Sequence, residues 1–436
     1  MTDYNKELMS FLDKSPTAFH AISSIKKKLI ASGYSELAES EKWELTEGGK
    51  YFVTRNDSSI IAFRVPRFNF TGFMISAAHS DSPAFKVKEN PEIIENGYVK
   101  LNVEGYGGML MAPWLDRPLS VAGRIIVKNG NKYEVRLVNV DRDLLLIPNV
   151  AIHMNCDANK GQTWNAQVDM LPVLGSADEA KGSFMRIIAE SASVSDSDII
   201  SHDLFLYVRD KGKVWGGSEE YISAPHLDDL QCVYGCLEGF LAAKNSHSVP
   251  VLAVFDNEET GSLTKQGADS TFLEDVLKRI SLASGKDEEG HYRAVSSSFM
   301  VSADNAHAVH PNHPEKADPI NRPMINKGIV IKFNAAQHYT TDAVSCAVYR
   351  DLCESNDIPV QVFTNRSDSR GGSTLGNVSN AHVSLNTVDI GLAQLAMHSC
   401  YETAGTKDTK HLIYAMTIFY SKTFRTYKAG LFELAD

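Results

Sequence analysis

The sequence predicts an α/β protein in which a mixed sheet is flanked by helices and is interrupted by a second, β-rich domain. Residues 3–31 repeat their apolar side chains with a helical period. Short apolar runs follow, and several end in polar or acidic residues, as strands of α/β folds do beside a ligand. Glycine-rich turns and short alternating runs replace this pattern over 86–215. We therefore expect a discontinuous main domain over 1–85 and 216–436, with 86–215 inserted.

Local signals set the order of the elements. Ser15-Pro16 interrupts the first helical stretch, because serine caps a helix and proline fits its first turn. Asn129-Gly130 predicts a hairpin between Arg124–Lys128 and Tyr133–Val138. Further strands are expected at Tyr51–Phe63, Phe70–Ala78, Asp203–Val208, Val251–Phe255, Phe299–Ala303, Gly328–Phe333 and Val360–Thr364. Helical patterns cover Leu230–Leu241, Thr340–Cys353, Leu395–Ser399 and Asp408–Phe424, and a polar surface connection is expected over Lys278–Tyr292.

Composition excludes several classes of protein. The formal charge of −11 over 436 residues argues against nucleic acid and anionic membranes as partners. No apolar run approaches the roughly 18 residues of a membrane span, and Met1–Lys6 lacks the features of a signal peptide. The six cysteines form no CxxC pair, which favours reduced, mostly buried thiols. We therefore expect a cytoplasmic protein.

The stretch Val251–Ser262 joins an apolar run to a cluster of acids. Its first five residues have the length and composition of a buried strand, and Glu258 and Glu259 follow directly. Adjacent glutamates at a strand end point to different sides, so one can bind a metal while the other faces a substrate. A hydrolase that activates water with a metal needs this division. Taken alone, the stretch is equally well explained as a solvated acidic loop.

Other polar residues lie at similar positions. His79 and Asp81 follow the strand that ends at Ala78, and Asp304 follows the strand that ends at Ala303. Asp228-Asp229 opens a helix, where the pair is either a helix cap or a bridge between two cations.

His153 stands alone within the β-rich region, where a lone histidine is ordinarily a structural group.

Four of these side chains, together with His398 in the stretch Leu395–Ser399, make a ligand set for two metal ions: His79, Asp228, Glu259, Asp304 and His398. Two histidines and three carboxylates, without thiolates, suit zinc, manganese or cobalt. One bridging carboxylate would give each ion one histidine, one terminal carboxylate and a share of the bridge. Two cations about 3.5–4 Å apart would activate a water, and Glu258 is positioned to take its proton. The sequence contains no GxSxG, GxxxxGK[ST] or GxGxxG motif at a strand end.

The motifs that carry this chemistry resemble those of the aspartyl aminopeptidase family of dinuclear metallopeptidases, peptidase family M18. They occur in the family's order from the first helix to the last: His79–Pro83, Leu227–Asp229, Phe255–Ser262, Ser302–Ala308 and Leu395–Ser399. One departure is Asp229, where the family usually has asparagine, and it adds a negative charge.

The resemblance implies a role for each site residue. His79 and Asp304 would hold one metal, Glu259 and His398 the other, and Asp228 would bridge them, with Glu258 as general base. Asp81 would orient His79, a role that metal-site chemistry also favours. His153 matches a histidine that enters a neighbouring subunit's active site. The substrate would meet residues that match family positions: His307, Lys332, Tyr339, Gly371, Gly372 and Ser373.

The resemblance also implies a fold, a substrate and an assembly. The main domain would be a phosphorylase/hydrolase-like catalytic domain, and residues 86–215 would form a dimerisation domain of a tetrahedral homododecamer. Peptides would be the substrates and zinc the expected metal, with Lys332 pairing with an acidic N-terminal residue. Two other functions stay open: a related dinuclear amidohydrolase or deblocking peptidase, and a catalytically silent assembly or binding protein.

Overall fold

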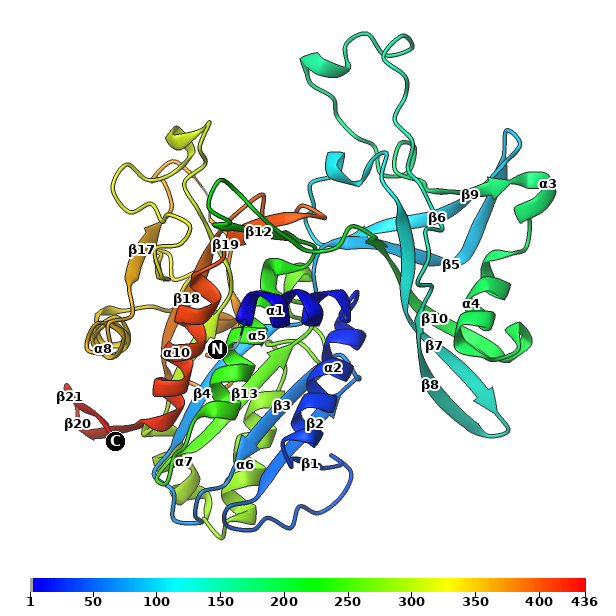
Figure 1. The fold of residues 1–436 in the computed structure, drawn as a ribbon. Helices are drawn as coiled ribbons and strands as arrows, with labels where there is room; N and C mark the ends of the chain where they lie inside the picture. The colour runs from blue at the N-terminus through cyan, green and yellow to red at the C-terminus, as the bar shows by residue number, and fades with distance from the viewer. Residues whose placement is uncertain (1–2, 370) are drawn as a thin grey trace.

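The computed structural model describes residues 3–369 and 371–436, and it contains a large mixed sheet and a smaller antiparallel one (Figure 1). The large sheet has thirteen strands, in the order β1-β2-β3-β13-β4-β14-β18-β19-β12-β11, with β15 and β16 paired to β18 and β17 paired to β16. Its strands are β1 (Ser35–Glu36), β2 (Lys50–Arg55), β3 (Ser59–Arg64), β4 (Phe73–His79), β11 (Lys213–Trp215), β12 (Tyr221–Ala224), β13 (Val249–Phe255), β14 (Phe299–Ala303), β15 (Ala306–His307), β16 (Ile329–Phe333), β17 (Val360–Thr364), β18 (Asn386–Leu395) and β19 (Glu402–Gly405).

Helices cover both faces of the large sheet. The first face carries α1 (Tyr4–Asp13), α2 (Ala18–Ala31), α5 (Leu227–Ala242), α8 (Ala343–Glu354) and α10 (Asp408–Ser421). The second carries α6 (Phe272–Ala283), α7 (Glu288–Ser296) and α9 (Leu375–Ser379). Along β13, Leu252 and Val254 join the first core while Val251, Ala253 and Phe255 join the second. Both faces of the strand are buried, so its residues are apolar without alternation. The predicted mixed sheet flanked by helices is confirmed.

The second sheet is antiparallel throughout and has the order β8-β7-β10-β5-β6-β9. It consists of β5 (Ala84–Glu95), β6 (Tyr98–Tyr106), β7 (Leu119–Asn129), β8 (Lys132–Asn139), β9 (Val173–Ser176) and β10 (Ile199–Val208), with α3 (Ala177–Ala180) and α4 (Phe184–Ala192) beside it. The sheet has a hydrophobic cluster of its own. A long connection from β8 to β9 projects away from both sheets (Figure 1). The assignment of 86–215 as a dimerisation domain stays a prediction.

Several predicted elements are present and two were wrong. Ser15-Pro16 separates α1 from α2, and β7 and β8 form the expected hairpin. Ser15 does not cap α2, however, because the residue at the N-cap is Thr17 and the helix begins at Ala18, after Pro16. Leu395–Ser399 is not helical, because it ends β18 and turns into the antiparallel β19, with positive φ at Ala396 and His398. Lys278–Tyr292 contains the end of α6 and the start of α7 instead of a simple connection. Its apolar residues are spaced for helices that cover the second face of the sheet.

Three further facts complete the fold. The chain ends in a separate hairpin of β20 (Thr423–Lys428) and β21 (Leu431–Ala435). Five of the six cysteines are buried and all six are free. Among the described residues, none of the helices has both the length and the apolar character needed to cross a bilayer.

Helices α5 and α10 pack unusually closely because α5 carries glycine where α10 crosses it. A Cβ atom on Gly235 would lie 2.5 Å from the Leu412 side chain, and one on Gly239 would lie 2.5 Å from Met416 Cβ and 2.9 Å from the Thr417 backbone nitrogen. The α5 helix begins at the candidate site, so its seat on α10 helps to fix the position of that site.

We expect Gly239→Ala to lower the free energy of unfolding by about 1–3 kcal/mol, because the clash with α10 backbone outweighs the gain in helix propensity. Denaturant unfolding measures the change. Gly217→Ala is the matched control, since no atom of the described residues lies within 4 Å of its added Cβ. A Gly239→Ala protein as stable as the wild type would contradict this packing.

Candidate metal centre

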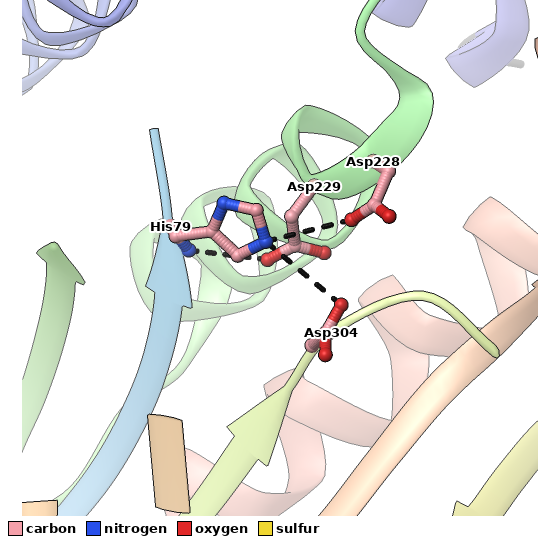
Figure 2. A group of neighbouring side chains, drawn as sticks. All are labelled: His79, Asp228, Asp229 and Asp304. Carbon is pink, nitrogen blue, oxygen red and sulfur yellow. Dashed lines mark hydrogen bonds and ion pairs between the residues drawn. The ribbon is translucent and has the colours of Figure 1, made fainter. Parts of the chain in front are cut away.

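Polar side chains from five segments converge at one edge of the large sheet. Strands β13, β4, β14 and β18 are parallel neighbours, so their carboxyl ends share that edge. His79 ends β4, Glu259 lies in the short helix η4 (Glu258–Thr260) after β13, and Asp304 follows β14. Asp228 opens α5, and His398 lies between β18 and β19. Figure 2 shows His79, Asp228, Asp229 and Asp304 directed toward one another.

The five predicted ligands all belong to groups of potential metal ligands. Two groups share Asp228: one contains His79, Asp228, Asp229 and Asp304, and the other contains Asp228, Glu259 and His398. A third contains His79, Glu258 and Glu259; in each group, the ligand atoms lie within 4.8 Å of one another. His79 Nε2 is 3.4 Å from Asp228 Oδ1 and 3.9 Å from Asp304 Oδ1. His398 Nε2 is 3.7 Å from Asp228 Oδ2 and 3.3 Å from Glu259 Oε2. Asp228 therefore faces both groups with different oxygens.

Both histidines are held by acceptors behind the ring. His79 Nδ1 lies 3.1 Å from the Asp81 carbonyl oxygen and 3.3 Å from Asp81 Oδ1. His398 Nδ1 lies 2.6 Å from the Gly108 carbonyl oxygen. A proton on each Nδ1 satisfies these acceptors and leaves the Nε2 lone pair directed into the cluster, the arrangement typical of histidine ligands.

Asp81 connects the acidic stretch to the first histidine. Its carboxylate accepts hydrogen bonds from the backbone nitrogens of Glu258 and Glu259, each at 3.2 Å, and from the Tyr106 hydroxyl at 2.6 Å. Although burial opposes ionisation, these contacts and His79 lower the pKa of Asp81. Asp81 therefore stays charged and fixes both the His79 ring and the η4 backbone.

Lys332, inside β16, faces Asp304. Its Nζ donates to the Asp304 carbonyl oxygen at 2.8 Å, to Asp304 Oδ2 at 3.1 Å and to the Asn305 carbonyl oxygen at 3.3 Å. Burial opposes ionisation of Asp304, but the ammonium and the His79 ring lower its pKa below the usual range. A buried lysine in a strand is thereby explained by its carboxylate partner.

Glu402, at the start of β19, is a site residue that sequence reasoning missed. It is buried and accepts hydrogen bonds from the backbone nitrogens of Asp228 at 2.9 Å and His398 at 2.8 Å. It therefore ties together the two segments that carry these potential ligands. Its only signal in the sequence is that it follows His398 by four residues.

Asp229 is fully buried beside the cluster, and the Asp228–Asp229 peptide is cis. Its Oδ2 accepts a hydrogen bond from the His79 backbone nitrogen at 3.1 Å. Burial and then the neighbouring carboxylates raise the pKa of Asp229 well above its usual value, with His79 opposing. The raised pKa favours the neutral form of the Asp229 carboxyl group. It therefore reduces the additional negative charge that was expected because the M18 family usually has asparagine here.

Glu258 lies beside the potential ligands and lines the same cleft. Burial raises its pKa to about 8, with His79 opposing the shift and nearby carboxylates adding to it. A carboxyl group with a pKa near neutrality suits a group that both takes and returns a proton.

The cleft at the cluster has a volume of about 180 Å³ and contains most of the predicted substrate residues. His307, Lys332, Tyr339, Gly372 and Ser373 line it together with the cluster. Gly371 is not part of this lining, and it packs against Asn365.

His153 lies on the exposed connection between β8 and β9, outside this cleft. The structure of one chain therefore does not bring it together with the other predicted site residues.

The cluster fits a metal on two observations. Asp228 Oδ1 and Glu259 Oε1 are buried and have no hydrogen-bond partner within the described chain, a costly state unless a cation is bound. Burial and then the charge of Asp228 raise the pKa of Glu259 well above its usual value, so these carboxylates need positive charge to stay ionised together. The donors are imidazole and carboxylate, which suit zinc.

The family model described as "Aminopeptidase I zinc metalloprotease (M18)" matches residues 11–420. The chain is 49% identical to "Probable M18 family aminopeptidase 2" of Clostridium acetobutylicum, over 96% of this chain and 99% of that protein. It is 41% identical to the Pseudomonas aeruginosa protein of the same name, over 97% and 99%.

Solved structures give the same result. The chain is similar to one in the cryo-EM structure of the Ape4 and Nbr1 complex, with a TM-score of 0.93, 34% identity and coverage of 96% of this chain and 85% of that one. The S. cerevisiae mApe1 dodecamer matches with a TM-score of 0.84, 28% identity and 96% coverage of each chain. The chain belongs to the M18 family and is a zinc metallo-aminopeptidase, a hydrolase of peptide bonds.

Proposed function

We propose that the enzyme uses two divalent cations, most readily zinc, held at the cluster with Asp228 as the bridge. His79 and Asp304 would complete one position, and Glu259 and His398 the other. The observation that carries this proposal is that the two oxygens of Asp228 face two different histidine–carboxylate pairs. The buried, unpartnered oxygens of Asp228 and Glu259 support it.

When bound, the two cations would lower the pKa of a water and polarise the substrate carbonyl. Glu258 is the general base in this proposal: it takes a proton from the attacking water and later gives it to the nitrogen of the leaving peptide. Asp81 holds the Glu258 backbone and the His79 ring in place. Lys332 keeps Asp304 ionised, and Glu402 keeps the Asp228 and His398 backbones together.

We expect Glu258→Gln to keep the wild-type zinc content and to lower kcat by about 10²–10⁴-fold, because the amide has no basic oxygen to take the proton. Zinc analysis and kinetics on the same sample measure both. Glu289→Gln, an exposed glutamate of α7, is the matched control. Substantial residual turnover by Glu258→Gln would overturn the assignment of the base.

We further propose that acidic N-terminal residues are preferred. Four carboxylates line the cleft, from Asp228, Glu258, Glu259 and Asp304. Two divalent cations would offset them, and Lys332 would leave the cleft with net positive charge. This charge favours an aspartate or glutamate side chain even though the Lys332 ammonium already contacts Asp304.

We expect kcat/KM on Asp- and Glu-anilides to exceed that on a Leu-anilide by about tenfold or more, the discrimination available to a charged pocket. Acetylated Asp-anilide is the matched control, because an aminopeptidase needs the free amine. A Leu-anilide that is cleaved fastest would reject the acidic preference, and cleavage of the acetylated substrate would favour a deblocking peptidase.

We propose that the enzyme assembles through the second sheet and that His153 acts in a neighbouring subunit's cleft. The connection that carries His153 exposes several large apolar side chains, Val150, Ile152, Met154 and Val168. Exposed apolar groups gathered on one segment are typical of an interface. The similarity to mApe1, described as a dodecamer, supports a homododecamer here.

Subunit mixing tests the role of His153. We expect His153→Ala and Glu258→Gln each to be nearly inactive, and co-expression of equal amounts of the two to restore about a quarter of the wild-type rate, because half of the sites keep Glu258 and random pairing supplies an intact His153 to about half of those. Differently tagged chains allow mixed assemblies to be isolated, and light scattering gives their mass. Mixed assemblies without restored activity would contradict action between subunits, as would a monomeric wild type.

A further inference from the structure

We propose that the segment Tyr106–Gly108, which ends β6 of the second sheet and continues beyond it, positions both halves of the metal centre. The inference rests on the proposed centre. It adds residues that contact the proposed ligands, or the residues that orient them, on the side away from the metal ions. The proposed ligands all come from the large sheet and its connections, whereas this segment begins at the last residue of β6 in the second sheet.

Tyr106 holds the first half. Its hydroxyl donates a hydrogen bond to Asp81 Oδ2 at 2.6 Å and accepts one from Asn257 Nδ2 at 2.8 Å. The ring packs edge-on against Phe205 of β10, with centroids 5.5 Å apart. The hydroxyl is thus fixed between a residue beside the general base and the carboxylate that holds His79. A hydrogen bond to a charged acceptor is among the stronger kinds.

Asp81 connects Tyr106 to the proposed metal centre. Its carboxylate and carbonyl oxygens contact His79 Nδ1, and its carboxylate accepts from the backbone nitrogens of Glu258 and Glu259. The placement of the Asp81 carboxylate therefore affects the His79 ring and the backbones of Glu258 and Glu259. Outer partners of this kind orient ligands and tune metal affinity.

Gly108 holds the second half, and Gly107 allows the close approach to Glu259. The Gly108 carbonyl oxygen accepts from His398 Nδ1 at 2.6 Å, and the Leu110 backbone nitrogen donates to the His398 carbonyl oxygen at 3.0 Å. Gly107 has a φ of +74°, and a Cβ on it would lie 3.0 Å from Glu259 Cβ. The segment therefore contacts His398 and lies close to Glu259, which belong to one proposed metal position, and it reaches His79 of the other position through Asp81.

The Tyr106–Asp81 hydrogen bond borders a cavity on its side away from the cleft. This separate cavity of about 390 Å³ is lined by Asp81, Tyr106, Asn257 and Phe205, among others. Packing on that side does not by itself hold the Asp81 carboxylate, so its position depends on its hydrogen bonds, of which the one from the Tyr106 hydroxyl is shorter than those from the backbone nitrogens of Glu258 and Glu259. A movement of the second sheet would change both halves of the centre together.

The first test is Tyr106→Phe, which removes the hydroxyl and keeps the ring. We expect zinc affinity of the metal-free protein, measured by competition with a chromogenic chelator, to fall by about tenfold or more. We also expect kcat to fall with little change in KM. Tyr98→Phe, on the same strand and 54% exposed, is the matched control and should behave as the wild type.

The second test separates contact with Glu259 from backbone strain. Gly107→Ala and Gly97→Ala both place alanine at a similar positive φ, +74° and +82°, but in the part of the chain that the structure describes nothing lies within 4 Å of a Cβ on Gly97. We expect Gly107→Ala to lower zinc affinity and Gly97→Ala to leave it unchanged. Circular dichroism and thermal unfolding confirm that each variant is folded.

Wild-type zinc affinity in Tyr106→Phe and in Gly107→Ala would overturn the inference while leaving the proposed centre intact. A wild-type protein that fails to take zinc from the chelator would instead overturn the proposed centre itself. Equal losses in Gly97→Ala and Gly107→Ala would assign the effect to backbone strain and would also contradict the role of the segment.

Discussion

The site depends on the electrostatic cost of gathering carboxylates in a buried place. Asp228, Glu259 and Asp304 meet at the edge of the large sheet, and oxygens of Asp228 and Glu259 have no partner within the described chain. Such an arrangement is unstable unless positive charge is supplied. Lys332 supplies one charge at Asp304, and the rest is left to bound cations. Metal binding is therefore expected to stabilise this part of the fold.

The strands and helices of the large sheet hold the proposed ligands in fixed positions. Parallel strands deliver His79, Glu259 and Asp304 to one edge, while α5 delivers Asp228 and is seated on α10 through its glycines. Outer residues then fix the ligands: Asp81 and Gly108 hold the histidine rings, and Glu402 holds two backbones. Because Gly108 follows β6 of the second sheet, the proposed centre draws on segments attached to both sheets. That arrangement links the chemistry to the part of the chain proposed to form the assembly.

The sequence predicted the elements that have a regular apolar pattern and the site residues that lie at the end of a strand. Apolar runs that end in acids gave β13 with Glu258 and Glu259, and β14 with Asp304, since parallel strands end at a shared edge. Glu402, Tyr106 and Gly108 were missed because they act on backbone groups and side chains that only the tertiary fold brings near. The helix expected at Leu395–Ser399 was wrong for the same reason: its apolar spacing matched a helix, but pairing of β18 with β19 made it a turn. The role of His153 in a neighbouring subunit stays a prediction, because the structure of one chain contains no contacts between subunits.

The number of zinc ions per chain tests the central claim most directly. Inductively coupled plasma mass spectrometry on the purified enzyme, after removal of loosely bound metal, should give about two equivalents per chain. His398→Ala removes a ligand from one position only and should leave about one, because His79, Asp228 and Asp304 still form the other. A wild type with a single equivalent, or a His398→Ala protein with an unchanged content, would contradict a dinuclear centre bridged by Asp228.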